Sequence, residues 1–199
     1  MSRNLFVGWL CLASMPAFAG DLTVVLKPDS SYSQEALATM EKEAASIYRP
    51  AGVQLKWRLA SELAEAENFQ DVVVVTLHGR CDSDGLLTTP QSSHGNKALG
   101  TTHISDRHIL PFATVECDSV RRYVRPRAAT LRQTEWDSLL GRALGRVVAH
   151  ELYHILSGST KHGQQGVAKA SHSQEDLDHT RFELSQADIR FLGDSAGKP

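Results

Sequence analysis

Cysteine, methionine and aromatic residues are scarce in this chain of 199 residues, and neither sign of charge is in excess. Three cysteines are too few for a disulfide-rich scaffold, and a chain of this length can stabilise itself with one hydrophobic core instead. With 21 basic and 23 acidic side chains, the chain lacks the net positive field of a protein that binds nucleic acid or anionic membranes. A content of 41% hydrophobic and 22% charged residues excludes disordered and collagen-like chains and is typical of globular proteins.

A long apolar run occurs only near the N-terminus. Residues 5–13 are almost entirely apolar, Arg3 precedes them, and Ala17 and Ala19 provide the small residues of a signal-peptidase site. We therefore expect residues 1–19 to be a signal peptide and residues 20–199 to form one domain that is secreted or periplasmic. The apolar run is too short to span a bilayer, so we expect no stable membrane insertion once the signal is removed.

The mature chain keeps two cysteines, Cys81 and Cys117. In an oxidising compartment an even pair favours one disulfide, with two buried free thiols as the alternative.

Hydrophobic periodicity predicts an α/β (α+β) fold with a mixed sheet of about 4–5 strands. The continuous apolar run at 71–77 is typical of a central strand that is covered on both faces. Five arginines between residues 121 and 132 favour a solvated connection into the next helix, with an anionic-ligand patch as the alternative. The predicted strands are 22–26, 53–58, 71–77, 98–104 and 112–117; the predicted helices are 34–48, a long helix from about 134 to 156, and a closing helix that follows the capping residues Ser185 and Asp188.

The long helix carries the sequence His150-Glu151-Leu152-Tyr153-His154. Histidines at i and i+4 lie on one helix face, so both imidazoles can bind one cation, and zinc is the usual ion. Glu151 lies beside them, where it can act as general base on a zinc-bound water.

A catalytic zinc site normally has a third protein ligand. We favour His162, because Gly158 can adopt the left-handed conformation that ends the helix and turns the chain back towards the metal. The remaining candidates lie further along the chain: His172, Glu175, Asp176 and His179.

The motif resembles that of the metzincin zinc metallopeptidases, HExxHxxGxxH, in which the third ligand is a histidine after a glycine turn. In the family spacing the glycine and third histidine would fall at Ser157 and Thr160, whereas this chain has Gly158 and His162. The methionine of the family's Met-turn is missing; residues 166–168 are the candidate for an equivalent turn. The order of predicted elements resembles the N-terminal half of the metzincin fold, and a gluzincin-like site with Glu175 as third ligand is the alternative.

These observations together predict an exported zinc metallopeptidase with a zincin-like, metzincin-like topology. His150, His154 and His162 are the expected ligands of one Zn²⁺ ion, and Glu151 is the expected catalytic base. The expected partner is a peptide or protein substrate, not nucleic acid. The resemblance implies that the substrate pairs with the predicted edge strand at 98–104. The alternative function is a catalytically inactive zinc-binding or interaction protein with the same fold.

Overall fold

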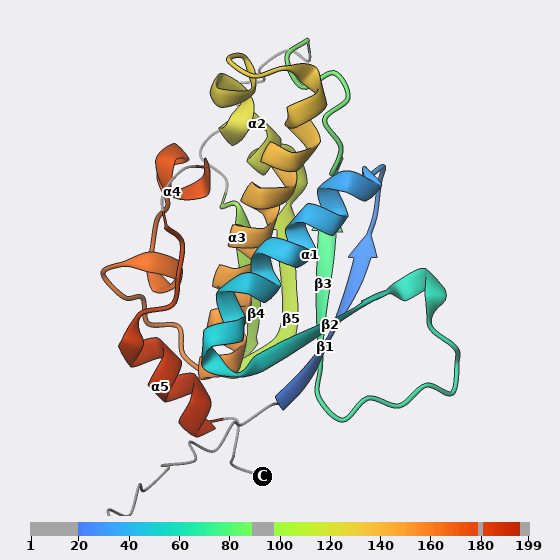
Figure 1. Ribbon diagram of the computed structural model, residues 1–199. Helices are drawn as coiled ribbons and strands as arrows, with labels where there is room; N and C mark the ends of the chain where they lie inside the picture. Colours follow the sequence, from blue (N-terminus) through green and yellow to red (C-terminus); the bar gives the residue numbers. More distant parts are fainter. Residues whose placement is uncertain (1–19, 89–97, 179–180, 196–199) are drawn as a thin grey trace, which may run out of the picture.

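The computed structural model describes residues 20–88, 98–178 and 181–195. The predicted signal peptide and the candidate ligand His179 lie outside the described residues. The elements, shown in Figure 1, are β1 (Gly20–Pro28), α1 (Gln34–Tyr48), β2 (Val53–Leu59), β3 (Val72–His78), β4 (Gly100–Ser105), β5 (His108–Glu116), α2 (Cys117–Ala128), α3 (Trp136–Ser157), α4 (Gln174–Asp178) and α5 (Gln186–Ser195).

The strands form one mixed five-stranded sheet in the order β2-β1-β3-β5-β4. β1, β2, β3 and β5 run parallel, whereas β4 pairs antiparallel with β5 and forms an edge of the sheet. The central position of β3 and the mixed sheet agree with the prediction from the sequence.

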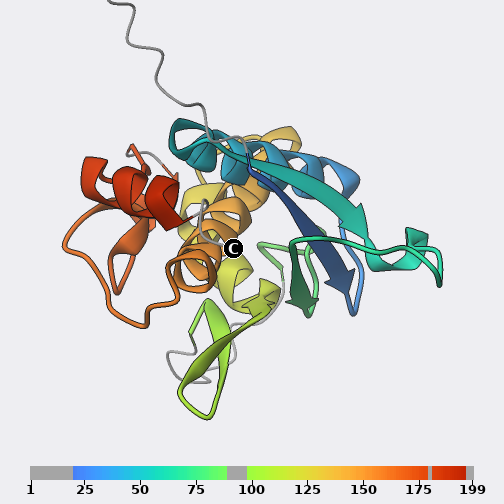
Figure 2. The same ribbon diagram turned by 90° about the horizontal axis from the view of Figure 1, so that it is seen from below.

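Helices α1 and α3 lie side by side over one face of the sheet (Figures 1 and 2). The expectation that β3 is covered on both faces was wrong. Val73, Val75 and Leu77 are buried under the helices, but Val72 and Val74, which point the other way, are only half-buried. A run of valines satisfies the β preference of the strand on either face, so it did not distinguish a two-layer from a three-layer arrangement.

The ends of the main helices follow local rules that the sequence already indicates. The Ser33 hydroxyl accepts a hydrogen bond from the Ala36 amide at the start of α1. Gly158 takes a left-handed conformation, with φ of 57°, directly after α3. This turn sends the chain back along the helix that carries the histidine motif.

The arginine-rich segment is a helix, α2, and the prediction of a solvated connection was wrong. Arg121 is buried and donates to the carbonyl oxygen of Asp84 at 2.6 Å, while Arg125 donates to that of Leu87 at 2.5 Å. The arginines thus hold the 80–88 loop against α2. Apolar periodicity did not predict this helix, because the segment is highly charged and contains Pro126.

A disulfide between Cys81 and Cys117 joins the residues just after β3 to the first turn of α2. Both half-cystines are buried. In the part of the chain that the structure describes, no helix has the length and apolar character needed to cross a membrane.

Candidate metal centre

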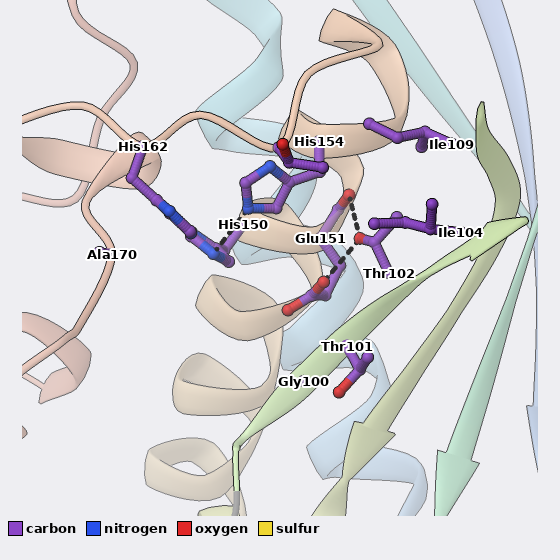
Figure 3. A pocket seen from close by; sticks show the side chains of 11 residues that line it. Gly100, Thr101, Thr102, Ile104, Ile109, His150, Glu151, His154, His162 and Ala170 are labelled. Atoms are coloured by element: carbon purple, nitrogen blue, oxygen red, sulfur yellow. Dashed lines mark hydrogen bonds between the residues drawn. The ribbon is translucent and has the colours of Figure 1, made fainter. Parts of the chain in front are cut away.

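Two histidines of α3 and one histidine from the following loop meet at a single point. The Nε2 atoms of His150 and His154 are 3.1 Å apart, as expected for residues one helical turn apart. His162 lies beyond Gly158, and its ring stacks parallel to that of His150 with centroids 5.4 Å apart. Ligand atoms of all three side chains lie within 4.8 Å of one another, which allows them to share one cation (Figure 3).

Backbone carbonyls fix the orientation of the two helical imidazoles. The Nδ1 atom of His150 lies 2.7 Å from the carbonyl oxygen of Val167, and that of His154 lies 2.7 Å from the carbonyl oxygen of Ser159. A carbonyl oxygen only accepts hydrogen bonds, so each Nδ1 carries the hydrogen and each Nε2 keeps its lone pair for a metal. Val167 belongs to the turn Gly166–Ala168, which therefore supports the site in the place where the sequence suggested a supporting turn.

The electrostatic environment favours neutral imidazoles. Burial lowers the pKa of His150, and the hydrogen bond to Val167 only partly opposes this effect. Burial likewise lowers the pKa of His154. Because a metal binds the neutral imidazole, both side chains are prepared for coordination near neutral pH. Three imidazoles whose ligand atoms converge fit the preference of zinc for nitrogen donors.

The other described candidates for the third ligand lie elsewhere. His172 packs behind His150, with its Nε2 atom 3.4 Å from the His150 Nδ1 atom, on the side away from the converging nitrogens. Burial lowers the pKa of His172 to about 4. The Asp176 carboxylate is held by the Lys169 ammonium group at 2.7 Å, and Glu175 is exposed on α4. Among the described residues, His162 is the one brought to the two helical histidines.

Glu151 is buried in the same cleft, with 4% of its surface exposed. Its Oε2 atom accepts a hydrogen bond from the Thr102 hydroxyl of β4 at 2.6 Å. Burial raises the pKa of Glu151, and the hydrogen bond from Thr102 opposes this rise. Gly100 makes the close approach of β4 possible, since a Cβ atom there would stand 2.5 Å from the Glu151 Oε1 atom. The sequence contains no signal for either contact, because both depend on how an edge strand lies against a helix.

The site opens into a cavity of about 280 Å³ between β4 and the chain that follows α3. His103 does not face it: its ring lies 2.9 Å from the Thr114 hydroxyl on the other face of the sheet. The Tyr153 hydroxyl donates to Asp188 of α5, so this side chain also points away from the histidines. The cavity is lined by Gly100, Thr101, Thr102, Ile104, Ile109, His150, Glu151, His154, Thr160, His162 and Ala170.

Comparison with known proteins identifies the fold. No family model matches the sequence. No curated protein sequence matches it significantly either. Among solved structures, the crystal structure of archaemetzincin from Methanopyrus kandleri is similar, with a TM-score of 0.53 and 14% sequence identity over 94% of this chain and 100% of that one. The chain therefore has a zincin-like fold of the metzincin type, as the motif and the order of elements predicted.

Proposed function

We propose that this chain is an exported zinc-dependent metallopeptidase. The observation that carries the proposal is the convergence of His150, His154 and His162 in a cleft that also holds the Glu151 carboxylate. The similarity of the fold to archaemetzincin supports the same assignment. The three histidines would hold the zinc ion, which supplies a Lewis acid and lowers the pKa of water at the site.

Glu151 is the general base in this proposal. Its Oε2 atom is engaged by Thr102, which leaves Oε1 to take the proton of the attacking water. The same carboxylate then passes that proton to the leaving nitrogen of the cleaved peptide bond. The hydrogen bond from Thr102 limits rotation of the carboxylate and so keeps it aligned with the cleft.

An extended peptide is the substrate that the edge strand favours. The Glu116 amide donates to the Leu99 carbonyl oxygen at 2.9 Å, which makes these two residues a hydrogen-bonded pair. In an antiparallel ladder the next pair turns its backbone groups outward, so the amide and carbonyl of Gly100 and then of Thr102 face away from β5. These groups can bind a substrate backbone by strand addition beside Glu151.

Metal content tests the ligand set. We expect elemental mass spectrometry of residues 20–199 to find one zinc per chain, lost in His162→Ala and retained in Glu175→Ala. Glu175 is a suitable matched control because it belonged to the alternative ligand set. Zinc that is retained in His162→Ala would contradict the assignment, and a wild-type protein without zinc after metal loading would overturn the proposal.

Hydrolysis separates a peptidase from an inactive zinc-binding protein. Glu151→Gln preserves the size of the side chain but removes the base, so we expect it to keep zinc and lose at least about a hundredfold in kcat, the usual contribution of a general base. A wild-type protein that binds zinc and cleaves no peptide in a mixed library would instead be the inactive zinc-binding protein.

A further inference from the structure

His172 is a half-buried polar side chain behind the metal centre, and no step of the proposed function uses it. It lies between the turn Gly166–Ala168 and α4. Its ring stands almost perpendicular to that of His150, with the centroids 5.1 Å apart, and its Nε2 atom is 3.4 Å from the His150 Nδ1 atom. The contact involves the nitrogen of His150 that faces away from the other ligands. A group in this place can set the direction of a metal ligand without binding the metal.

The hydrogen bonds of His150 determine which tautomer His172 adopts. The Nδ1–H group of His150 donates to the Val167 carbonyl oxygen at 2.7 Å, and the Nε2 atom of His172 lies within reach of the same group. Two N–H groups would repel each other across this contact, so the His172 Nε2 atom presents its lone pair and the hydrogen lies on Nδ1. The N–H group of His150 therefore has two acceptors, a near one in the main chain and a more distant one in His172.

This tautomer leaves a hydrogen-bond donor of His172 unused. Its Nδ1 atom is buried and has no hydrogen-bond partner among the described residues. A buried donor without an acceptor destabilises the fold, whereas an apolar ring in the same place would pack against His150 and Phe182 without this penalty. Packing alone therefore does not account for a histidine here. Its Nε2 atom is the feature that an apolar ring lacks.

Helix α2 and Phe182 hold His172 in place. The Tyr123 hydroxyl of α2 donates to the His172 carbonyl oxygen at 2.5 Å, and the Gln174 side chain donates to the Tyr123 carbonyl oxygen at 2.9 Å. The Phe182 ring packs edge-on against the His172 ring, with the centroids 4.9 Å apart. These contacts come from segments before and after His172 in the chain, and they hold both its backbone and its ring. A support has to be fixed independently of the group that it orients, and His172 meets this condition.

We propose that His172 is a positioning residue of the metal centre, which accepts a second hydrogen bond from His150 and so aligns that ligand. The inference rests on the metal centre of the proposed function and adds a residue behind its ligands. A second acceptor restricts rotation of the His150 ring more than the main-chain carbonyl does alone. The Nε2 atom of His150 then stays directed at the point that it shares with the other two ligands.

Two substitutions separate the hydrogen bond from packing. In His172→Gln the side-chain amide oxygen can replace the Nε2 atom as acceptor, whereas His172→Phe keeps a ring but offers no acceptor. His103→Phe is the matched control, because the His103 ring contacts the Thr114 hydroxyl on the other face of the sheet. The zinc affinity of residues 20–199 is measured by competition with a chromophoric chelator, and the absorption of the Co²⁺-loaded protein reports the coordination geometry. Urea unfolding of the metal-free protein measures the stability of each variant.

We expect His172→Phe to weaken zinc binding about 10–100-fold and to alter the Co²⁺ spectrum, the usual effect of losing a group that orients a metal ligand. His172→Gln should stay within about threefold of wild type and His103→Phe within about twofold, because neither removes the acceptor beside His150. The metal-free His172→Phe protein should be at least as stable as wild type, since the substitution removes the unpartnered donor. A residue with only a structural role would instead lower the stability and leave the Co²⁺ spectrum unchanged.

The inference is overturned if His172→Phe binds zinc as tightly as wild type, or if His172→Gln loses as much affinity as His172→Phe. If His172→Phe does not fold, His172→Leu, which also lacks an acceptor, takes its place. Hydrolysis of a mixed peptide library by the wild-type protein tests the peptidase proposal separately. The expected order of zinc affinities without hydrolysis would refute the peptidase and leave the inference standing, whereas hydrolysis together with unchanged affinities would refute the inference alone.

Discussion

The contact between α1 and α3 depends on glycine, and we expect Gly145→Ala to destabilise the protein. A Cβ atom at Gly145 would stand 2.6 Å from the Met40 carbonyl oxygen and 2.8 Å from the Glu43 Cβ atom. The carbonyl belongs to the backbone of α1 and cannot rotate away, so the two helices must separate. Overpacking of this kind costs roughly 1–3 kcal/mol, whereas replacing a helical glycine by alanine gains up to about 1 kcal/mol.

The net expectation is a loss of up to about 2 kcal/mol, or up to roughly 8 °C in Tm for a domain of this size. Gly193→Ala is the matched control, because nothing lies within 4 Å of a Cβ atom at that position of α5. It should raise stability by up to about 1 kcal/mol through helix propensity alone. Urea and thermal unfolding at a fixed zinc concentration measure both variants. A Gly145→Ala protein as stable as Gly193→Ala would refute the reasoning.

Three further predictions follow from other contacts. In Gly100→Ala the added Cβ atom would stand 2.5 Å from the Glu151 Oε1 atom. We expect it to displace the base and to reduce kcat about a hundredfold, while the zinc content stays unchanged. An unaltered kcat would contradict this prediction. The disulfide joins residues that are 36 positions apart, and its reduction should lower the free energy of unfolding by about 3–4 kcal/mol, measured by urea unfolding. A decrease below about 1 kcal/mol would show that the unfolded chain gains little conformational entropy when the disulfide is reduced. The Asp29–His78 pair raises the pKa of His78 and lowers that of Asp29, mainly through their mutual hydrogen bond. Its contribution should be complete between about pH 4 and 6.5, fall as pH rises through the raised pKa of His78, and fall again as pH drops through the lowered pKa of Asp29. The difference in stability between wild type and His78→Gln, measured from pH 2 to 9, should therefore be largest between about pH 4 and 6.5 and smaller at both ends of the range. A difference that does not change with pH would contradict this prediction.

Local signals accounted for much of the fold. Apolar periodicity predicted the bounds of α1, and Gly158 marked the end of α3. Elements without apolar periodicity were not predicted. Helix α2 is the example, because its arginines donate hydrogen bonds to a neighbouring loop and do not form an apolar face. Coverage of the sheet could not be deduced either, because the run of valines in β3 suits a strand with one or two covered faces.

The candidate site also combines features that the sequence predicts with features that depend on the fold. The i, i+4 spacing of His150 and His154 is a property of one helix and could be read directly from the sequence. The choice of His162 over His172 depends on the path of the loop after α3, which brings one ring to the cleft and the other behind His150. The contact of Thr102 with Glu151 joins segments 49 residues apart and carries no local signature.

The use of main-chain oxygens to hold the imidazoles has a consequence for mutational tolerance. Replacing the side chain of Ser159 or Val167 leaves the accepting carbonyl in place, so the orientation of His150 and His154 can persist while these residues vary. Insertions or deletions in this segment would move the carbonyls and should be far more damaging than substitutions. Gly166 is the exception, because its φ of 60° and the adjacent Glu183 carbonyl leave no room for a side chain. Distant homologues would then be recognised more readily by the length of this segment and its glycine than by the identity of the residues between.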